Sequence, residues 1–435
     1  MLISGLPLYS NAKDPDFGLL GQPHVFSHSP AYLHLLWKKV IQHHPQVLIQ
    51  VQNLKSTGFD IEVSKQAFYP TPSITLERAQ SKGGNDPSYS GTPQVAIYRL
   101  QQPLWTGGRL SAQQNKAAAN QEIEVARLLE VQQGLALKTL QAWTEVVNFQ
   151  RQQTALVKTK NELENLQTKI ERRAEQGLST QSEVKLSRLR VSMVKQLLNQ
   201  TKMQEDLAWL RLKQWVPEAQ PLSQATHTHP APSNASKAHL QNTENIDWDA
   251  LSATQSPVAL RLKSQMKIQA AELDEKRAAY QPEVYLRAEH QRGNYAFANA
   301  QNVNRLFIGM TASTGAGLSL QNQLASLMAK HDSAQHEIAL TQRLLSETVQ
   351  SDVLNLIARQ SKAEELKLNL ESLQDIQTAW LRQFDSGRKT WIEVMNAAQE
   401  TMQSQMSLIE NDTSMQLSYW RLQILAFGLA RWESP

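Results

Sequence analysis

No proline interrupts residues 111–176, which read SAQQNKAAANQEIEVARLLEVQQGLALKTLQAWTEVVNFQRQQTALVKTKNELENLQTKIERRAEQ. Proline breaks a helix because it lacks an amide hydrogen and its ring clashes with the preceding turn. The stretch therefore predicts one continuous helix. At ~1.5 Å per residue such a helix would be about 100 Å long. Globular domains rarely contain helices of this length, so the stretch indicates a rod-shaped protein.

Residues 111–176 belong to a longer stretch without proline between Pro103 and Pro217, and a second such stretch runs from Pro282 to the terminal Pro435. Each of the two stretches contains one glycine in a polar, turn-like setting, Gly177 in the first and Gly387 in the second. Glycine adopts the left-handed conformation that ends many helices at no steric cost. We therefore expect each stretch to form two helices joined by a tight turn.

The apolar residues of these predicted hairpins are spaced by alternating steps of three and four residues, as in coiled coils. The series in the first hairpin is Leu186, Leu189, Met193, Gln196, Gln200, Met203, Leu207 and Leu210. The series in the second is Leu366, Leu370, Leu373, Gln377, Trp380 and Phe384. Taken alone, both series fit an ordinary dimeric coiled coil with a few polar positions that set the register equally well.

The order of features occurs twice along the chain. Pro45 opens a helical stretch that ends before Pro70, and Pro257 opens one that ends before Pro282, with the same spacing in both copies. Gly107-Gly108-Arg109-Leu110-Ser111 corresponds to Gly315-Ala316-Gly317-Leu318-Ser319 in the second copy. We predict a first repeat at residues 41–216 and a second at 248–432, each with a helix, two strands and a long helical hairpin. An N-terminal extension at 1–40 and a linker at 217–247 complete the predicted domains.

Four short segments have strand character, at residues 72–78, 94–104, 283–290 and 306–313. Their apolar positions include Ile74, Leu76, Tyr98, Leu100, Val284, Leu286, Leu306 and Ile308. In places these alternate with polar residues, which suits one face toward lipid and one toward water. Because ~8 strands form the smallest bacterial membrane barrel, four strands would need other chains for closure. A soluble four-stranded sheet at one end of a helical bundle explains the periodicity equally well.

Composition argues against several classes of protein. Only 41% of the 435 residues are hydrophobic, and glutamine is frequent in the long segments, where a packed interior would need larger apolar residues. A net charge of +4, with both signs interspersed, argues against nucleic-acid binding. No run of roughly 18 apolar residues is present, so we expect no transmembrane helix. Residues 1–10 lack the pattern of a signal peptide, so we expect either that a signal has been removed or that the chain stays inside the cell.

Nothing in the sequence indicates catalysis or a bound cofactor. The chain has no cysteine, which excludes disulfides, thiolate metal sites, cysteine nucleophiles and a lipid-bearing N-terminal cysteine. It has no nucleophile elbow, phosphate-binding loop or zinc-ligand spacing. His227 and His229 lie in the proline-rich linker, where two histidines are usually solvated rather than metal-bound. We predict no enzyme, no cofactor and no metal site.

The duplicated order of helix, two strands and two long helices resembles the TolC family of outer-membrane factors over about residues 44–432. The most specific local match is the second predicted hairpin tip, which is similar to the family's aromatic, Gly, Thr and Asp-Val signature in Phe384, Gly387, Thr390, Glu393 and Val394. In the first repeat, Gly177-Leu178 and Glu183-Val184 hold the pattern, with Ala174 at the aromatic position. The passage Gln102-Pro103-Leu104-Trp105, followed by Gly107-Gly108-Arg109, is similar to the family's entry into its first long helix.

The resemblance implies an α+β fold of long coiled-coil hairpins with four strands per chain. In the family, a homotrimer forms a twelve-stranded β-barrel on a twelve-helix periplasmic tunnel. The implied location is the outer membrane with a periplasmic extension. The implied partners are outer-membrane lipid, a periplasmic adaptor and an inner-membrane transporter, and we expect no nucleic acid.

The resemblance also implies a gate at the hairpin tips. Glu393 occupies the position of an acidic residue at the family's tunnel aperture. Lys389 occupies the position of its basic partner, and Phe384 that of the aromatic residue at the tip. Asn396 falls on a second position that is acidic in the best-known member, and it departs from that pattern. Glu183 is the gate candidate of the first repeat, and the implied adaptor-docking residues are Gly177, Leu178, Gly387 and Arg388. The alternative for Glu393 and Lys389 is a solvated pair one helical turn apart, which contributes a few tenths of a kcal/mol.

The sequence hypothesis for function is therefore the exit duct of a tripartite export system. Ducts for type I secretion of proteins, including large adhesins, commonly lack a lipid-bearing N-terminal cysteine. Because this chain has no cysteine, we favour a protein cargo that is exported with an ABC transporter and an adaptor. Small-molecule efflux is the alternative within the family. A periplasmic coiled-coil adaptor or scaffold is the alternative of another class, although adaptors generally carry a single hairpin.

Overall fold

The computed structural model describes residues 30–78, 94–217, 219, 256–294, 302–312 and 319–428. The statements about structure below concern these residues. Part of the predicted N-terminal extension (1–29), most of the predicted linker with His227 and His229, and the predicted glycine-rich segment 315–318 lie outside them.

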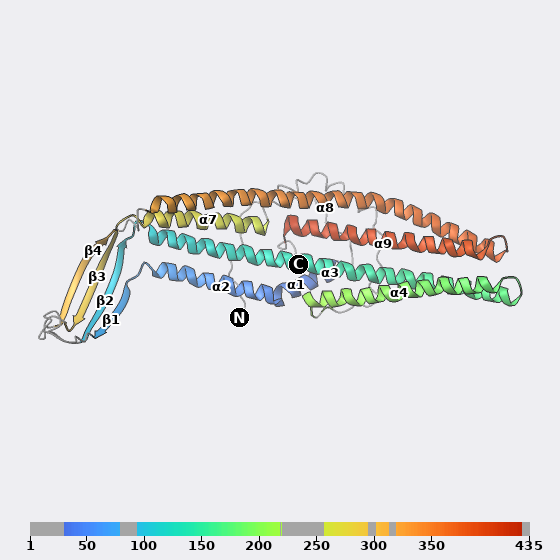
Figure 1. Cartoon of the computed structure of the whole chain (residues 1–435), viewed down its shortest axis with the longest axis horizontal. Coiled ribbons are helices and arrows are strands. Elements are labelled where there is room, and N and C mark those ends of the chain that lie inside the picture. The colour runs from blue at the N-terminus through green and yellow to red at the C-terminus, as the bar shows by residue number, and fades with distance from the viewer. Residues whose placement is uncertain are drawn as a thin grey trace.

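The molecule is a long rod with a four-stranded sheet at one end and two helical hairpin tips at the other (Figure 1). The first repeat contains α2 (Pro45–Gln66), β1 (Thr71–Arg78), β2 (Gln94–Trp105), α3 (Arg109–Glu175) and α4 (Gln181–Trp215). The second contains α7 (Pro257–Ala278), β3 (Glu283–Arg292), β4 (Val303–Thr311), α8 (Leu320–Asp385) and α9 (Trp391–Phe427). A further helix, α1 (Pro30–His43), precedes the first repeat. The duplication predicted from the order of prolines and glycines is therefore confirmed in the fold.

The two longest helices have the predicted lengths, with 67 residues in α3 and 66 in α8. Pro45 and Pro257 open α2 and α7, where a missing amide hydrogen costs nothing because the first turn leaves it unpaired. The positions of the prolines, together with the long stretches that lack proline, therefore account for both long hairpins. None of the described helices contains an apolar stretch sufficient to cross a membrane.

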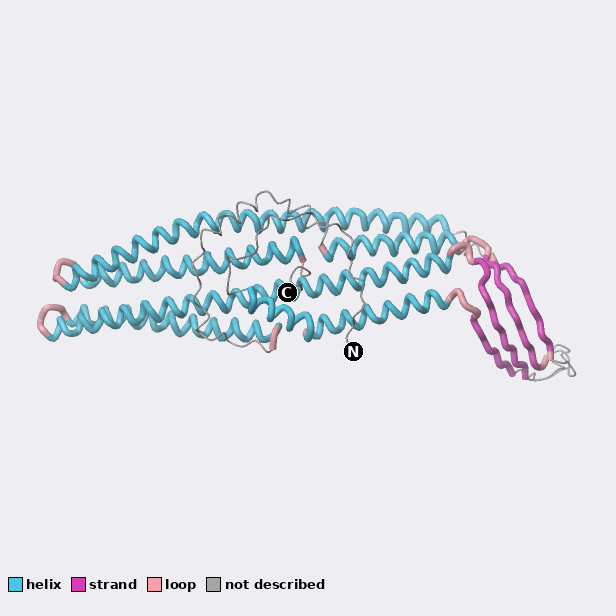
Figure 2. Tube along the Cα trace, turned by 180° about the vertical axis from the view of Figure 1, so that it is seen from behind, coloured by secondary structure: helices cyan, strands magenta, loops and turns pink. Residues whose placement is uncertain are grey.

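The sheet joins the two repeats, because β2 of the first repeat pairs with β3 of the second in the antiparallel order β1-β2-β3-β4 (Figure 2). Strands β1, β2 and β3 agree with the predicted segments to within two residues. The prediction for β4 was wrong by three residues at its start, since the strand begins at Val303 rather than Leu306. Asn304 and Arg305 are too polar to indicate a strand, but they pair across to His290 and Glu289 of β3.

Side chains from five helices, α1, α2, α3, α4 and α9, form a buried cluster midway along the rod. Trp37 of α1 is 2% exposed and donates its indole N–H to the carbonyl of Ala136 in α3 at 3.2 Å. Trp420 of α9 lies edge-on to Trp37 with ring centroids 6.5 Å apart. The helix α1 was not predicted, because residues 1–40 were assigned to an N-terminal extension without a helix. Its apolar residues pack into this cluster, which anchors α1 to both repeats.

The two predicted coiled-coil series differ in what they contact. Leu189, Met193 and Met203 of α4 are each more than half exposed, and α4 packs through other residues, including Val191 and Leu212. The α4 series therefore forms no packed seam within the single chain, and a contact with another chain stays a prediction. In the second hairpin, Phe384 is buried and the other five members of the series are half-buried. The buried residues of α4 are mostly small or β-branched, whereas most of the larger apolar side chains of the series lie outside.

Candidate gating site at the hairpin tips

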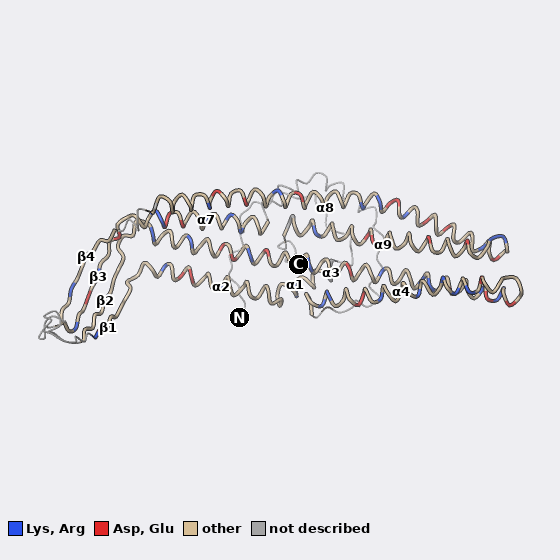
Figure 3. The backbone as a smooth tube through the Cα atoms, in the orientation of Figure 1, with Lys and Arg blue, Asp and Glu red and all other residues tan. Residues whose placement is uncertain are grey.

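The two hairpin tips lie side by side at the end of the rod opposite the sheet (Figures 1 and 2). The turn of each tip is closed by an equivalent backbone hydrogen bond. Leu178 N donates to Arg173 O at 2.8 Å in the first, and Arg388 N donates to Gln383 O at 2.8 Å in the second. Lys and Arg side chains are interspersed with Asp and Glu along both hairpins as they approach the tips (Figure 3).

Gly177 and Gly387 supply the turn conformation at the two tips. Their φ angles are +73° and +76°, in the left-handed region that favours glycine. A Cβ atom added to either would meet no other atom within 4 Å. Conformation rather than space therefore requires glycine here. The neighbouring Leu178 and Arg388 are exposed, and they occupy the same position in the two tips.

Glu393 has three hydrogen bonds at the start of α9. Its Oε1 accepts from Lys389 Nζ at 2.6 Å, and its Oε2 accepts from the Thr390 amide at 3.1 Å and the Thr390 hydroxyl at 2.8 Å. The bond from Lys389, followed by those from Thr390, lowers the pKa of Glu393 to about 2. Lys389 also lies 4.3 Å from the centre of the Trp380 ring. The predicted Lys389 and Glu393 partners therefore meet, and the same carboxylate caps α9.

Glu183 takes the equivalent place at the start of α4. Its Oε2 accepts from the Thr180 amide at 2.8 Å, and its own amide donates to Thr180 Oγ1 at 3.3 Å. The Thr180 amide is the largest cause that lowers the pKa of Glu183, and the Trp391 side chain is the next. Trp391 belongs to α9, so this effect comes from the second hairpin. Glu183 therefore caps its own helix and contacts the other hairpin.

Further contacts between the hairpins were not predicted from the sequence. Lys169 Nζ of α3 lies 2.7 and 2.9 Å from the two carboxylate oxygens of Asp385 in α8. Arg173 donates to the Phe384 carbonyl at 3.2 Å, and its guanidinium lies 4.9 Å from the centre of the Phe384 ring. Basic residues in the last turn of α3 were visible in the sequence. Their partners depend on how the two hairpins are placed, which local patterns do not encode.

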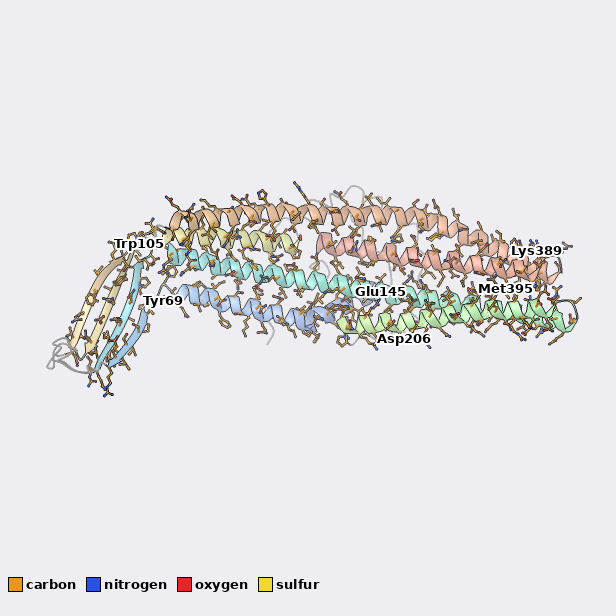
Figure 4. All side chains as sticks on the ribbon, viewed as in Figure 1. Tyr69, Trp105, Glu145, Asp206, Lys389 and Met395 are labelled. Carbon is orange, nitrogen blue, oxygen red and sulfur yellow. The ribbon has the colours of Figure 1, made fainter. Side chains whose placement is uncertain are left out.

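Phe384 and Asn396 lie in different surroundings. Phe384 is 3% exposed and packs in a buried cluster with Trp391, Val394 and Met395, so it joins the two hairpins from inside. Asn396 is exposed on α9, one turn beyond Glu393. Lys389 and Met395 are labelled at this end of the rod in Figure 4, whereas Tyr69 and Trp105 mark the other end, where helices meet strands.

The eight predicted strand residues lie together on one face of the sheet. The register pairs Ile74 with Tyr98, and it pairs Leu286 with Ile308. Several members of this face are largely exposed: Ile74 66%, Leu76 73%, Leu306 71%, Ile308 77% and Met310 70%. An exposed apolar surface of this kind is rare on a monomeric soluble protein and marks contact with lipid or another chain.

The family described as outer membrane efflux protein matches residues 36–216 of the chain. No curated protein matches the sequence significantly. Among solved structures, the outer-membrane channel OprN aligns with a TM-score of 0.75 at 13% identity, over 92% of this chain and 90% of that one. The outer-membrane protein VceC of Vibrio cholerae aligns with a TM-score of 0.74 at 15% identity, over 92% and 96%. CusC, whose structures concern folding and transmembrane channel formation, aligns with a TM-score of 0.75 at 12% identity, over 92% and 93%.

The fold of the chain, with its paired hairpin tips, is therefore that of the solved channel proteins OprN and CusC. The first repeat matches the family described as outer membrane efflux protein, over less than half of the chain.

Proposed function

We propose that the chain is the exit duct of a tripartite export system, in which a homotrimer connects the outer membrane to a periplasmic adaptor and an inner-membrane transporter. The observation that supports this most is the exposed apolar face of the sheet at one end of the long helical rod. That face suits lipid, and a helix of 67 residues spans about 100 Å at 1.5 Å per residue. The rod is long enough to carry cargo across an aqueous compartment.

The edges of the sheet support the proposed trimer. β1 and β4 are the outer strands of the order β1-β2-β3-β4, so each has one edge without a partner among the described residues. Such edges pair readily with other strands. Three copies with four strands each would form an even-numbered antiparallel barrel of the type found in outer membranes. The exposed Leu189, Met193 and Met203 of α4 would then contact a neighbouring chain.

The gate is proposed at the hairpin tips, where Glu393 and Lys389 lie. Three copies of Glu393 around a threefold axis would repel one another, and the Lys389 ammonium at 2.6 Å offsets that repulsion within each chain. Glu183, Lys169 and Arg173 hold the second hairpin against the first. We assign the adaptor to the turns Gly177-Leu178 and Gly387-Arg388, whose residues are exposed.

We propose that the cargo is a protein exported by type I secretion, which is the hypothesis drawn from the sequence. Small-molecule efflux is the second candidate, because the matched family is described as an efflux family. Deleting the gene and measuring both phenotypes separates the two. Loss of a large protein from the culture medium with unchanged drug susceptibility supports secretion. Drug hypersensitivity with unchanged secretion contradicts it and supports efflux.

An adaptor or scaffold is the candidate of another class, and purification separates it from a duct. The duct predicts that the full chain needs detergent to stay in solution. A chain that is soluble and monomeric without detergent would contradict the duct.

A further inference from the structure

The face of the sheet opposite the apolar residues carries a row of charged side chains. The register pairs Ser73 with Arg99, Arg99 with Glu289, and Glu289 with Arg305. Residues paired in this way stand side by side on the same face. Two arginines and one glutamate therefore share one level of the sheet.

Glu289 compensates only part of this charge. Its Oε2 accepts from Arg99 Nε at 2.9 Å, and its Oε1 lies 3.7 Å from Arg305 Nη1. The Glu289 side chain is 7% exposed, whereas those of Arg99 and Arg305 are 37% and 44% exposed. One buried carboxylate thus lies between two guanidinium groups that remain accessible to solvent. The row keeps a net positive charge.

Arg287 adds a third guanidinium in the adjacent row. Its Cζ lies 4.7 Å from the centre of the Phe307 ring and 5.8 Å from that of Tyr285. Its Nε is buried without a hydrogen-bond partner, and no ion pair with a carboxylate is found for it among the described residues. Aromatic rings hold a guanidinium in place without removing its charge. Arg287 therefore carries a positive charge and an unfilled donor.

The other charged residues described on this face lie toward the ends of the sheet. Glu77 is two rows away from Arg99 along β1, and Glu283 is paired with Arg109 of α3 at the helical end. Arg78 and Arg292 lie on the opposite, apolar face, as shown for Arg292 by its pairing with Ala96. Positive charge is therefore concentrated in the middle of the polar face.

We propose that Arg99, Arg287 and Arg305 around Glu289, which we name the arginine belt, make the membrane end of the channel selective for anions. The inference rests on the proposed channel function, in which the polar face lines the water-filled interior. Rings of charged side chains set ion selectivity in pores, and each chain contributes two net positive charges to the belt. The guanidinium fork also matches carboxylate, sulfate and phosphate groups. The belt attracts solutes that carry these anionic groups.

The reversal potential of the reconstituted channel in a KCl gradient tests this inference. Arg305 is the most exposed member of the row. Arg305→Gln is expected to lower the ratio of chloride to potassium permeability by at least about twofold, because it removes a positive charge from every subunit. Glu289→Gln keeps the side-chain shape and removes the negative charge, so it is expected to raise the ratio.

Arg292→Gln is the matched control, since it removes the same charge from β3 on the opposite face. The ratio should stay unchanged in this variant. Opposite shifts in the two belt variants support the belt. A conducting trimer whose ratio is unmoved by either belt variant overturns it, as does an equal shift in Arg292→Gln. A wild-type trimer that conducts no current contradicts the channel function and the belt with it.

Discussion

Glu393 shows how one side chain can serve a helix end and a proposed gate. Its carboxylate accepts hydrogen bonds from Thr390 and Lys389, so capping and charge pairing occupy the same group. Glu183 caps the equivalent helix of the first repeat, but its additional partner is Trp391 rather than a lysine. The duplication therefore preserves the cap and changes the second contact.

Replacing Glu393 should raise the conductance of the reconstituted channel. Glu393→Ala removes the cap and the charge, whereas Glu393→Gln can still accept from Thr390 and lacks only the ion pair with Lys389. If the ion pair holds the gate, both variants conduct more than the wild type. An increase in Glu393→Ala alone would show that the cap, rather than the gate, had been removed. Unchanged conductance in both would contradict the gate.

Acid should weaken the same contact. The pKa of Glu393 falls from its ordinary value of 4.5 to about 2, mainly through the Lys389 hydrogen bond. A lowered pKa means that the contact stabilises the structure above pH 4.5 and that its contribution is lost as the pH falls toward 2. The wild-type conductance should therefore rise through this window. The matched Glu393→Gln variant should lack this rise, and an identical pH profile in both would exclude Glu393 as its source.

At the scale of elements, local sequence patterns predicted the helices and strands, but not the contacts between elements that lie far apart in the sequence. Proline positions and the two turn glycines predicted the helical hairpins, and alternating apolar residues predicted the strands. The outward direction of the α4 series was missed, because heptad spacing indicates that a helix has an apolar face and not which neighbour covers it. The contact between Lys169 and Asp385 was also missed, since it joins residues from different repeats.

The turn at Gly387 should matter for docking and not for assembly. Its φ of +76° is costly for any residue with a Cβ, so Gly387→Val should distort the second tip. Capture of the adaptor should fall while the trimer stays intact by size-exclusion chromatography in detergent. Gly134→Val is the control, because Gly134 lies inside α3, where valine is at least as favourable as glycine. Loss of the trimer in Gly387→Val would assign this turn to folding instead.

The ion pair between the hairpins should make the gate sensitive to salt. Lys169 and Asp385 are 44% and 50% exposed, so their pair contributes at most about 1 kcal/mol and is screened by salt. Asp385→Asn should raise conductance at low salt and reduce the difference between low and high salt. Arg188→Gln is the control, because it breaks a pair with Glu171 inside the first hairpin. Equal effects of the two variants would contradict a latch between hairpins.

The two ends of the whole molecule have different kinds of surface. At one end, an apolar face of the sheet is exposed and two strand edges have no partner in the part of the chain that the structure describes. At the other end, the hairpin tips are held together by polar contacts on charged helices. A single chain leaves the sheet edges and the α4 leucines and methionines open, which several copies around one axis would cover.

The mass of the detergent-solubilised protein should therefore be that of three chains. Leu76→Lys on β1 should lower the yield of trimer inserted in lipid vesicles, because Leu76 is 73% exposed on the apolar face. Thr75→Lys is the control on the adjacent, opposite-facing position of the same strand. Equal insertion of both variants would show that the apolar face does not contact lipid.

The most direct test of an exit duct is the electrical conductance of the purified chain in a planar lipid bilayer. The proposed trimer predicts discrete current steps that are small in the wild type and larger in Glu393→Gln. A protein that inserts without producing current in either form would contradict the central claim.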